Sequence, residues 1–218
     1  MVKRGQHLGG LKELSVKLKP KESFLIIGGG ASALWLKHPS IRWNDYTIIT
    51  VNCACLLCKC DIWMSFDRNS WLDTWWGDAR AKYHLLGEQQ EHTARGHQKY
   101  YPQNFYTFEH ERSIMPNNDR LEKFKLKGGA TISGCAIQLA ASFDSTKTIH
   151  VTGCDMYDAN THFYDSEKPP VARGTEWSGS QAMRLAWIMR ECEGKGIDVA
   201  HIGFTAMSKY GVKEVIPK

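Results

Sequence analysis

The chain has 218 residues, of which 42% are hydrophobic and 23% are charged, and its formal net charge is +5 at pH 7. This length and composition are typical of one globular α/β domain with a sizeable core. They exclude a transmembrane helix from our expectations, because no stretch approaches the ~18 consecutive apolar residues that such a helix needs. The basic N-terminus lacks the apolar run of a secretory signal, so we expect a cytoplasmic protein. Because the charge is spread along the sequence, a pocket for an anionic small molecule explains it as well as a nucleic-acid surface would.

The first third of the chain alternates between strand and helix signals. Phe24–Ile27 is a short, fully apolar run of the kind that forms a buried parallel strand. Three glycines follow it, and Ala31–Lys37 then predicts a helix that ends before Pro39. Tyr46–Val51, which is rich in β-branched residues, and Asp61–Phe66 are the second and third expected strands.

The middle of the chain is polar and aromatic and gives no clear period. We expect residues 68–127 to be an insertion of helices and loops that forms one wall of a cleft. Its tryptophans, Trp71, Trp75 and Trp76, fit core or interface positions, and stacking on a sugar or a base is the alternative.

Beyond this insertion the alternation resumes. The expected elements are a helix at Ser133–Phe143, a fourth strand at Thr148–Gly153, a helix at Gln181–Glu193 and a last strand at Val199–Phe204. The polar stretch over 156–178 contains Pro169 and Pro170 and is expected to act as a lid. Strands that alternate with helices predict an α/β fold. We expect one Rossmann-like domain over residues 1–218, with a doubly wound, mostly parallel sheet and helices on both faces.

The segment ESFLIIGGGASAL runs from the first strand into three glycines. Gly28, Gly30 and Ala33 satisfy the dinucleotide-binding pattern G-x-G-x-x-G/A, and with Gly29 they predict a turn whose backbone passes close to a phosphate. A tight strand-to-helix turn without a ligand is the alternative. An NAD site also needs an acidic residue about 20 positions later. The chain has Asn52 there, which suits a base edge or a phosphate as well as a ribose.

Polar side chains follow three of the expected strands. Asn52 follows the second strand, Asp67 the third and Asp155 the fourth. The carboxyl ends of parallel strands line the ligand crevice of a doubly wound sheet, so these residues are expected beside the glycine loop. Capping of the loops by each residue separately is the alternative.

Five segments of the chain occur in the order found in one Rossmann-like superfamily: FLIIGGGASAL, TIITVN, DIWMSFD, ATISGCAIQLAASF and IHVTGCDMYD. They resemble the bacterial CMP-sialic-acid-dependent sialyltransferases. They are also similar to related uncharacterised proteins that are grouped with flagellin glycosyltransferases and archaeal hydroxymethylpterin diphosphokinases. The matching positions are Gly28, Gly30, Ser32, Asn52, Ser133, Gly134, Gly153, Asp155 and Tyr157. The resemblance covers residues 23–158 in pieces and leaves the polar middle unmatched.

The resemblance implies a site for a CMP- or NDP-linked sugar at the carboxyl-end edge of the sheet. The glycine loop and the strand-end amide would hold the nucleotide, while Tyr157 and Tyr164 would bind the leaving phosphate. A glycan or another hydroxyl compound would accept the sugar. No cofactor or metal is expected, and the sequence leaves an oligomer open.

The chain departs from the sialyltransferases at one catalytic position. Those enzymes place a general-base histidine before the last helix, where this chain has ARGTEWSGSQAM. We therefore expect His162 or Asp155 to be the base, with Arg173 among the groups that stabilise the phosphate. The alternatives are a nucleotide-binding protein without catalysis, which the missing histidine favours, and an NAD(P)-dependent oxidoreductase, which only the glycine pattern favours.

The segment CACLLCKC places four thiols, Cys53, Cys55, Cys58 and Cys60, within eight residues. A zinc or iron–sulfur site is one interpretation. Zinc usually takes two ligands from each of two separated segments, so we expect these cysteines to be structural. The chain has seven cysteines and no recognisable export signal, which favours reduced thiols over disulfides.

Overall fold

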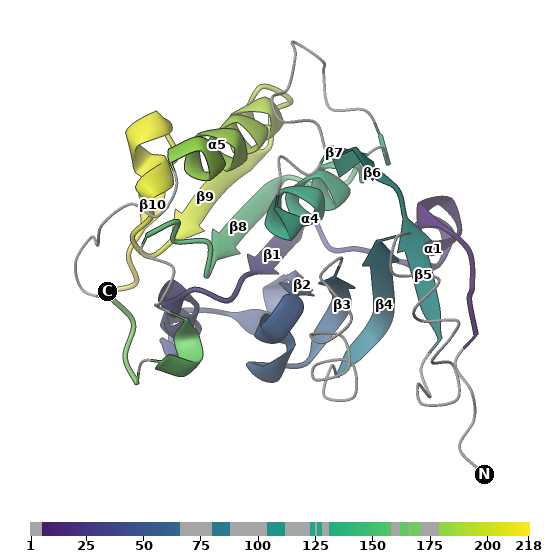
Figure 1. The fold of residues 1–218 in the computed structure, drawn as a ribbon, viewed down its shortest axis with the longest axis horizontal. Coiled ribbons are helices and arrows are strands. Elements are labelled where there is room, and N and C mark those ends of the chain that lie inside the picture. The colour runs from purple at the N-terminus through teal and green to yellow at the C-terminus, as the bar shows by residue number, and fades with distance from the viewer. Residues whose placement is uncertain are drawn as a thin grey trace.

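The computed structural model describes residues 6–65, 80–87, 104–111, 123–124, 126–127, 131–157, 162–165, 167–170 and 179–218. Its central feature is an eight-stranded sheet with the strand order β10-β9-β8-β1-β2-β3-β4-β5 (Figure 1). Every pair of neighbouring strands in this sheet is parallel. The structure therefore confirms the predicted Rossmann-like α/β fold class.

The strands of the large sheet are short, and most coincide with the apolar runs of the sequence. They are β1 (Ser23–Ile27), β2 (Thr47–Val51), β3 (Cys60–Ser65), β4 (Ala81–Gly87), β5 (Phe105–Phe108), β8 (Thr148–Thr152), β9 (Asp198–Ile202) and β10 (Glu214–Val215). A separate two-stranded sheet pairs β6 (His110–Glu111) with β7 (Leu126–Lys127). The five strands that the sequence predicts are confirmed, with ends that differ by a residue or two.

Helical segments cover both faces of the large sheet. The described helices are α1 (Leu11–Lys17), α4 (Ile132–Ala141) and α5 (Gly179–Glu193), and the 3-10 helices are η1 (Ala31–Lys37), η2 (Trp43–Asp45), η3 (Asn52–Leu56), η4 (Phe163–Asp165) and η5 (Ala206–Tyr210). α4 and α5 pack in one core cluster, and the buried residues of η1 and η3 pack in a second one. No helix among the described residues is long and apolar enough to cross a membrane.

Strand β1 contains a continuous apolar run because both faces of the strand are covered. Phe24 and Ile26 belong to the cluster under α4 and α5, whereas Leu25 and Ile27 belong to the cluster under η1. All four side chains are fully buried. A strand covered on both faces cannot alternate between apolar and polar residues, so β1 reads as one hydrophobic block.

The middle of the chain differs from our expectation. We expected helices and loops there, but the described parts of this range contain strands: β4 and β5 extend the main sheet beyond β3, and β6 and β7 form the small sheet. The signal in β4 was obscured by His84, which is buried and packs edge-on against Trp63 with 5.7 Å between ring centroids. β5 has only four residues, too few for a period to be recognised. Trp71, Trp75, Trp76 and Asp67 lie outside the described residues.

The predicted helix after the glycines also takes a tighter form. Ala31–Lys37 is a 3-10 helix that ends at His38, the residue before Pro39. The i→i+3 hydrogen bonds of such a helix have a poorer geometry than those of an α-helix.

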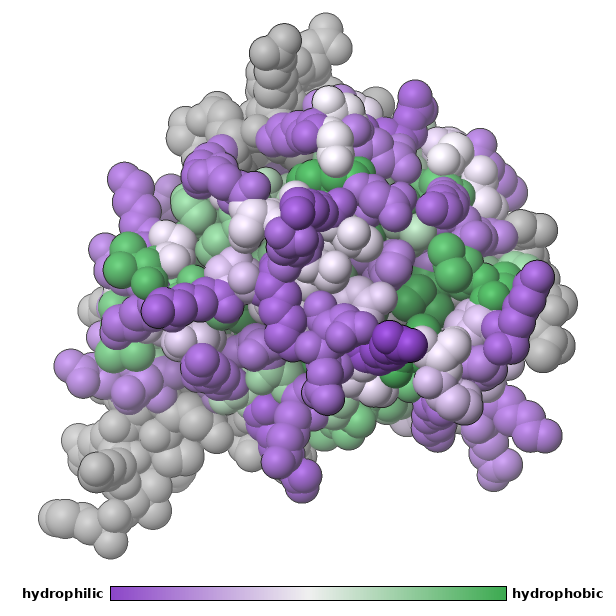
Figure 2. All heavy atoms as spheres, turned by 180° about the vertical axis from the view of Figure 1, so that it is seen from behind, coloured by the Kyte–Doolittle hydropathy of each residue, from purple (hydrophilic) through white to green (hydrophobic). Residues whose placement is uncertain are grey.

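On the face drawn in Figure 2, large hydrophobic side chains form small, separate patches among hydrophilic residues. Among the described residues, the exposed ones are Val16, Leu56, Tyr164 and Val215.

Candidate functional site

The candidate site lies where the strand order reverses. β1 pairs with β2 on one side and with β8 on the other, and the chain leaves β1 and β8 in opposite directions along the sheet. The carboxyl ends of strands at such a switch point are where open α/β sheets bind ligands. Two glycine-containing turns meet at this point: Gly28–Gly30 after β1, which we call the glycine loop, and the turn at Gly153 after β8.

The glycines allow these two turns to touch each other. A Cβ atom on Gly28 would lie 2.4 Å from the Gly153 carbonyl oxygen, and one on Gly153 would lie 2.2 Å from the Gly28 oxygen. Gly153 also has a φ of +68°, which side chains of L residues rarely adopt. The sequence predicted a close approach of the loop to a phosphate. The close approach exists, and the partner at Gly28 is the backbone of the protein itself.

The loop N–H groups are largely engaged. Gly28 N–H donates to the Thr152 carbonyl at 2.8 Å and Gly30 N–H donates to the Gly153 carbonyl at 2.8 Å, so the ladder between β1 and β8 continues past the strand ends. A Cβ atom on Gly30 would lie 2.9 Å from Asp155. The N–H groups of Gly28 and Gly30 are therefore already used in hydrogen bonds within the protein.

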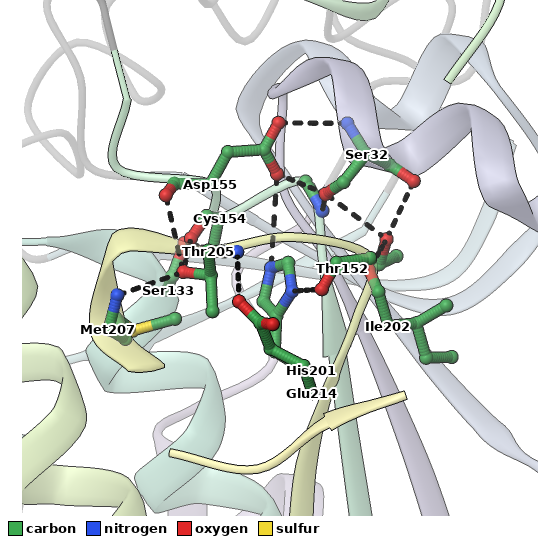
Figure 3. A network of polar contacts seen from close by, with 12 residues as sticks. Ser32, Ser133, Thr152, Cys154, Asp155, His201, Ile202, Thr205, Met207 and Glu214 are labelled. Atoms are coloured by element: carbon green, nitrogen blue, oxygen red, sulfur yellow. Dashed lines mark hydrogen bonds and ion pairs between the residues drawn. The ribbon is translucent and has the colours of Figure 1, made fainter. Parts of the chain in front are cut away.

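Asp155 fixes the first turn of η1 (Figure 3). Its Oδ2 accepts from the Ser32 N–H at 2.8 Å, and its Oδ1 accepts a short hydrogen bond from the Ser32 hydroxyl. The Ser32 oxygen in turn accepts from the Gly153 N–H at 2.8 Å. Ser32 is fully buried and Asp155 is 7% exposed. The predicted residues Ser32, Gly153 and Asp155 thus form one buried network that joins the two turns.

His201, on β9, is the member of this network that sequence reasoning missed. Its Nδ1 donates to the Gly203 carbonyl at 3.1 Å, and its Nε2 lies 3.8 Å from Asp155 Oδ1. Burial lowers the pKa of His201, while the nearby carboxylates of Asp155 and Glu214 oppose this change. Burial also raises the pKa of Asp155, which His201 and Ser32 oppose. A signal was present in the sequence, because His201 is a histidine inside the apolar run Val199–Phe204, which predicts a strand.

Two threonines complete the buried network. Thr152 donates its hydroxyl to the Ser32 carbonyl at 3.0 Å or the Ile202 carbonyl at 3.1 Å, and so joins η1 to β9. Thr205 donates to the carbonyls of Cys154 and Asp155, both at 3.2 Å. The turns after β1, β8 and β9 are therefore held together by side chains that solvent does not reach.

Side chains on the outer side of the glycine loop are exposed. Phe163 in η4 is buried, and its N–H donates to the Gly29 carbonyl at 3.0 Å. On either side of this anchor, the rings of His162 and Tyr164 stack with centroids 4.8 Å apart and planes 5° from parallel. Tyr164 is 54% exposed and the His162 side chain 40%. We call His162 and Tyr164 the aromatic rim.

The His162 ring has a carboxylate partner. Nδ1 lies 3.4 Å from Asp165 Oδ2, which also accepts the His162 backbone N–H at 3.1 Å. A carboxylate at Nδ1 favours the tautomer that carries its proton there, and this leaves Nε2 able to accept a proton. The lid that the sequence predicted over 156–178 contributes this segment, and its movement stays a prediction.

The remaining predicted residues are distributed around the network. Ser133, near the start of α4, accepts a hydrogen bond from the Cys154 thiol at 3.2 Å, and so lies beside the β8 turn. Gly134 follows it and donates its N–H to Thr131 at 3.0 Å, as the cap of α4 requires. The Tyr157 ring packs on the cluster under α4 and α5, and its hydroxyl oxygen is buried. Phe163, which lies between the two rim residues, belongs to the other core cluster, the one that contains the buried residues of η1 and η3. Tyr157 and Phe163 therefore pack in different clusters.

Asn52 begins η3 with a φ of 49° in the left-handed region, where asparagine is among the residues tolerated. Its side-chain oxygen accepts from the Ser65 hydroxyl at 3.0 Å, and its carbonyl accepts from the Trp63 indole at 2.9 Å. Asn52 therefore ties the end of β2 to β3. This is the loop-fixing role that the sequence offered as the alternative to ligand binding.

The cysteine segment lies between β2 and β3. Cys53, Cys55 and Cys60 are buried, and burial raises the pKa of Cys60 to about 11 and that of Cys58 to about 12. The raised pKa values make Cys58 and Cys60 poor nucleophiles, because the thiolate is the reactive form. Among the described residues, no group of three histidine, cysteine or carboxylate side chains is arranged to hold a metal ion.

Comparisons of the chain with models of protein families, with curated proteins and with solved structures find no match. A functional assignment therefore depends on the residues of the site itself.

Proposed function

We propose that the protein binds a nucleotide or nucleotide-sugar at the carboxyl-end edge of its sheet and transfers the sugar to a hydroxyl acceptor. The observation that carries this proposal is the aromatic rim, because His162 and Tyr164 are the exposed aromatic side chains that lie next to the glycine loop at the switch point. Ligands of doubly wound sheets bind at this place. An exposed aromatic face offers a platform on which a base or a sugar ring can stack.

The rim also supplies a base for the reaction. In the proposed transfer, the acceptor oxygen attacks the anomeric carbon while the bond from that carbon to the nucleotide phosphate oxygen breaks. The phosphate leaves with the bonding electron pair, and His162 Nε2 takes the acceptor proton. Asp165, 3.4 Å from His162 Nδ1, would stabilise the resulting imidazolium. Among the described residues, the partly buried Gly29 and the Tyr164 hydroxyl lie beside it and could stabilise a departing phosphate, whereas Arg173 lies outside the described residues.

A first experiment tests binding with CMP, CDP, UDP, GDP, their sugar conjugates and NAD(H) in a thermal-shift assay. A ligand at about 100 times its Kd stabilises the folded protein by ~2.7 kcal/mol. We expect a CMP-linked sugar or a nucleoside-diphosphate sugar to raise the Tm of the wild type. We expect Tyr164→Ala to remove that increase. His38→Gln is the matched control, because His38 is a partly exposed histidine at the far end of η1. The absence of any ligand-induced increase in the wild type would exclude the proposed function.

A second experiment tests catalysis by measuring release of the nucleotide from whichever conjugate binds. Loss of a general base lowers turnover ~100- to 10,000-fold. We expect this loss in His162→Gln, with conjugate affinity changed much less. Equal turnover in the two proteins would remove His162 from the mechanism.

Binding without catalysis is the second candidate function, and one observation favours it. Of the four predicted catalytic residues, Asp155 is buried and each of its oxygens accepts a hydrogen bond from Ser32, and the Tyr157 hydroxyl oxygen is buried as well. A bound conjugate that is never turned over in the presence of simple sugar acceptors would favour this candidate. A shift with NAD(H) alone would instead favour the oxidoreductase alternative.

A further inference from the structure

We propose that Asp155 and His201 hold a single proton between them, and that this proton keeps Asp155 on Ser32 and so positions the glycine loop. His201 would then be a positioning residue of the site, acting through Asp155. The inference rests on the proposed function only in treating the glycine loop as a binding loop. The shared proton itself is independent of any ligand.

The first step is the tautomer of His201. A carbonyl oxygen can only accept, so the hydrogen bond of 3.1 Å to Gly203 places a proton on Nδ1. If the ring is neutral, Nε2 then carries a lone pair. This lone pair would face Asp155 Oδ1, 3.8 Å away, and Nε2 is buried with no hydrogen-bond partner among the described residues.

The second step counts protons on the pair. With no further proton, a lone pair faces a carboxylate in a site that solvent does not reach, and an uncompensated negative charge is buried. With two further protons, the buried pair carries a net positive charge. With one proton the pair is neutral overall, either as imidazolium and carboxylate or as imidazole and carboxylic acid. Low-dielectric surroundings favour this state over the other two.

The third step asks whether other charges alter the count. Glu214 on β10 pairs in register with His201, and its carboxylate is engaged by the Thr205 N–H at 2.9 Å. It favours a proton on His201. The remaining neighbours on the turn after β8 and on η1 are neutral, because burial raises the pKa of Cys154 to about 12 and Ser32 does not titrate. The surroundings therefore favour keeping one proton.

The fourth step connects the proton to the glycine loop. Both Asp155 oxygens accept from Ser32, whose hydroxyl oxygen accepts in turn from Gly153. Asp155 can accept both hydrogen bonds without leaving a net charge buried only while it shares the proton with His201. Loss of the proton, or of the ring that shares it, would thus loosen Ser32 and the turn that Gly28–Gly30 form.

The test uses NMR on the full-length protein labelled with ¹⁵N and ¹³C, with the His201 ring assigned by comparison with His201→Gln. We expect either an imidazolium that persists at neutral pH or an Nδ1–H ring beside a protonated Asp155 carboxyl group. A His201 ring that titrates with a midpoint near 6.5, an Nε2–H tautomer, or a neutral ring beside an ionised carboxylate would overturn the proposal.

A pair of variants tests the positioning role through hydrogen exchange of the Ser32 amide. Leucine and glutamine have similar volumes, and only glutamine can donate to Asp155. We expect Ser32 exchange at least tenfold faster in His201→Leu than in His201→Gln. Equal exchange rates would show that His201 acts by packing alone and would overturn the role. If His201→Leu does not fold, His201→Gln is compared with the wild type: because the ring that shares the proton is lost, we expect faster Ser32 exchange in the variant, and equal exchange would overturn the role. Failure of the nucleotide assay affects neither measurement, so the two proposals fail separately.

Discussion

The two sides of the glycine loop differ in what their polar groups are free to do. On the inner side, Asp155, Ser32 and His201 are at most 7% exposed, and their hydrogen bonds run to one another and to the backbone. On the outer side, His162 and Tyr164 are 40% to 54% exposed and stack on each other. The residues on the inner side therefore fix the position of the glycine loop. The residues on the outer side are accessible, and they are the ones to which our proposal assigns ligand binding and catalysis.

The largest expected effect is on the inner side. Asp155→Ala would leave the Ser32 donors and the His201 ring without their partner in a buried site, and breaking a buried charged pair costs ~3–5 kcal/mol. Urea unfolding monitored by circular dichroism measures this loss of stability. Tyr164→Ala is the contrasting variant from the outer side. A loss below ~1 kcal/mol in Asp155→Ala would mean that the inner network does not hold the loop.

A side chain added at the contact between the two glycine turns should also destabilise the fold. Gly28→Ala would place a methyl group 2.4 Å from the Gly153 carbonyl oxygen, which belongs to backbone and cannot swing away. Overpacking of this kind costs ~1–3 kcal/mol or more. Gly194→Ala is the matched control, since its new Cβ would meet nothing closer than 3.5 Å. An equal change in urea midpoint for the two variants would contradict the close contact between the turns.

The shared proton of the inner side predicts a particular pH dependence. The ordinary pKa values are 3.8 for aspartate and 6.5 for histidine, and burial raises the first and lowers the second in the folded state. Between pH 3.8 and 6.5 the folded and unfolded pairs both bind one proton, so their contribution to stability is flat. Above pH 6.5 the unfolded pair has lost both protons, while on our proposal the folded pair keeps one, so stability falls as pH rises until the folded pair releases its proton as well. Below pH 3.8 the unfolded pair binds two protons, and stability falls as pH falls.

The measurement is the difference in unfolding free energy between wild type and Asp155→Asn across this range. Each proton held only by the folded state contributes ~1.4 kcal/mol per pH unit. The variant has no carboxyl proton to lose, so its stability should lack the alkaline decrease. If the unfolding free energies of the two proteins change in parallel above pH 6.5, Asp155 and His201 do not hold the proton.

The same contrast explains what the sequence could predict. Apolar runs such as Phe24–Ile27 predict strands because both faces of the sheet are covered, and the glycine turns mark the switch point because only glycine fits there. The sequence could not tell that Gly28 approaches the backbone of Gly153, because a close approach to backbone and one to a phosphate both need a residue without a side chain. His201 was missed because its partner is 46 positions away in the chain, and only the order of the strands brings β9 beside β8.

Strands β4 and β5 were missed for a related reason. Their polar and aromatic residues become buried only through contacts across strands, such as that between His84 and Trp63. A local pattern carries no trace of such contacts. The rim residues His162 and Tyr164 were named from the sequence, Tyr164 as a second tyrosine after the motif that carries the resemblance and His162 as a histidine near that motif. Their roles stay predictions, whereas the buried network could be seen only once the strand order was known.

The smallest expected effect on stability belongs to the rim. Tyr164 is 54% exposed, so Tyr164→Ala should change the free energy of unfolding by no more than ~0.5 kcal/mol. Removing the ring also removes the surface on which His162 stacks, and base–aromatic stacking is worth ~1–3 kcal/mol, or roughly 5- to 150-fold in affinity. Urea unfolding and nucleotide titration of the same preparation give both quantities. Tyr164→Phe keeps the ring and should retain most of the affinity, which separates stacking from hydrogen bonding by the hydroxyl. A large loss of stability together with unchanged affinity would reverse the assignment, making the rim structural and sending the search for the ligand to another edge of the sheet.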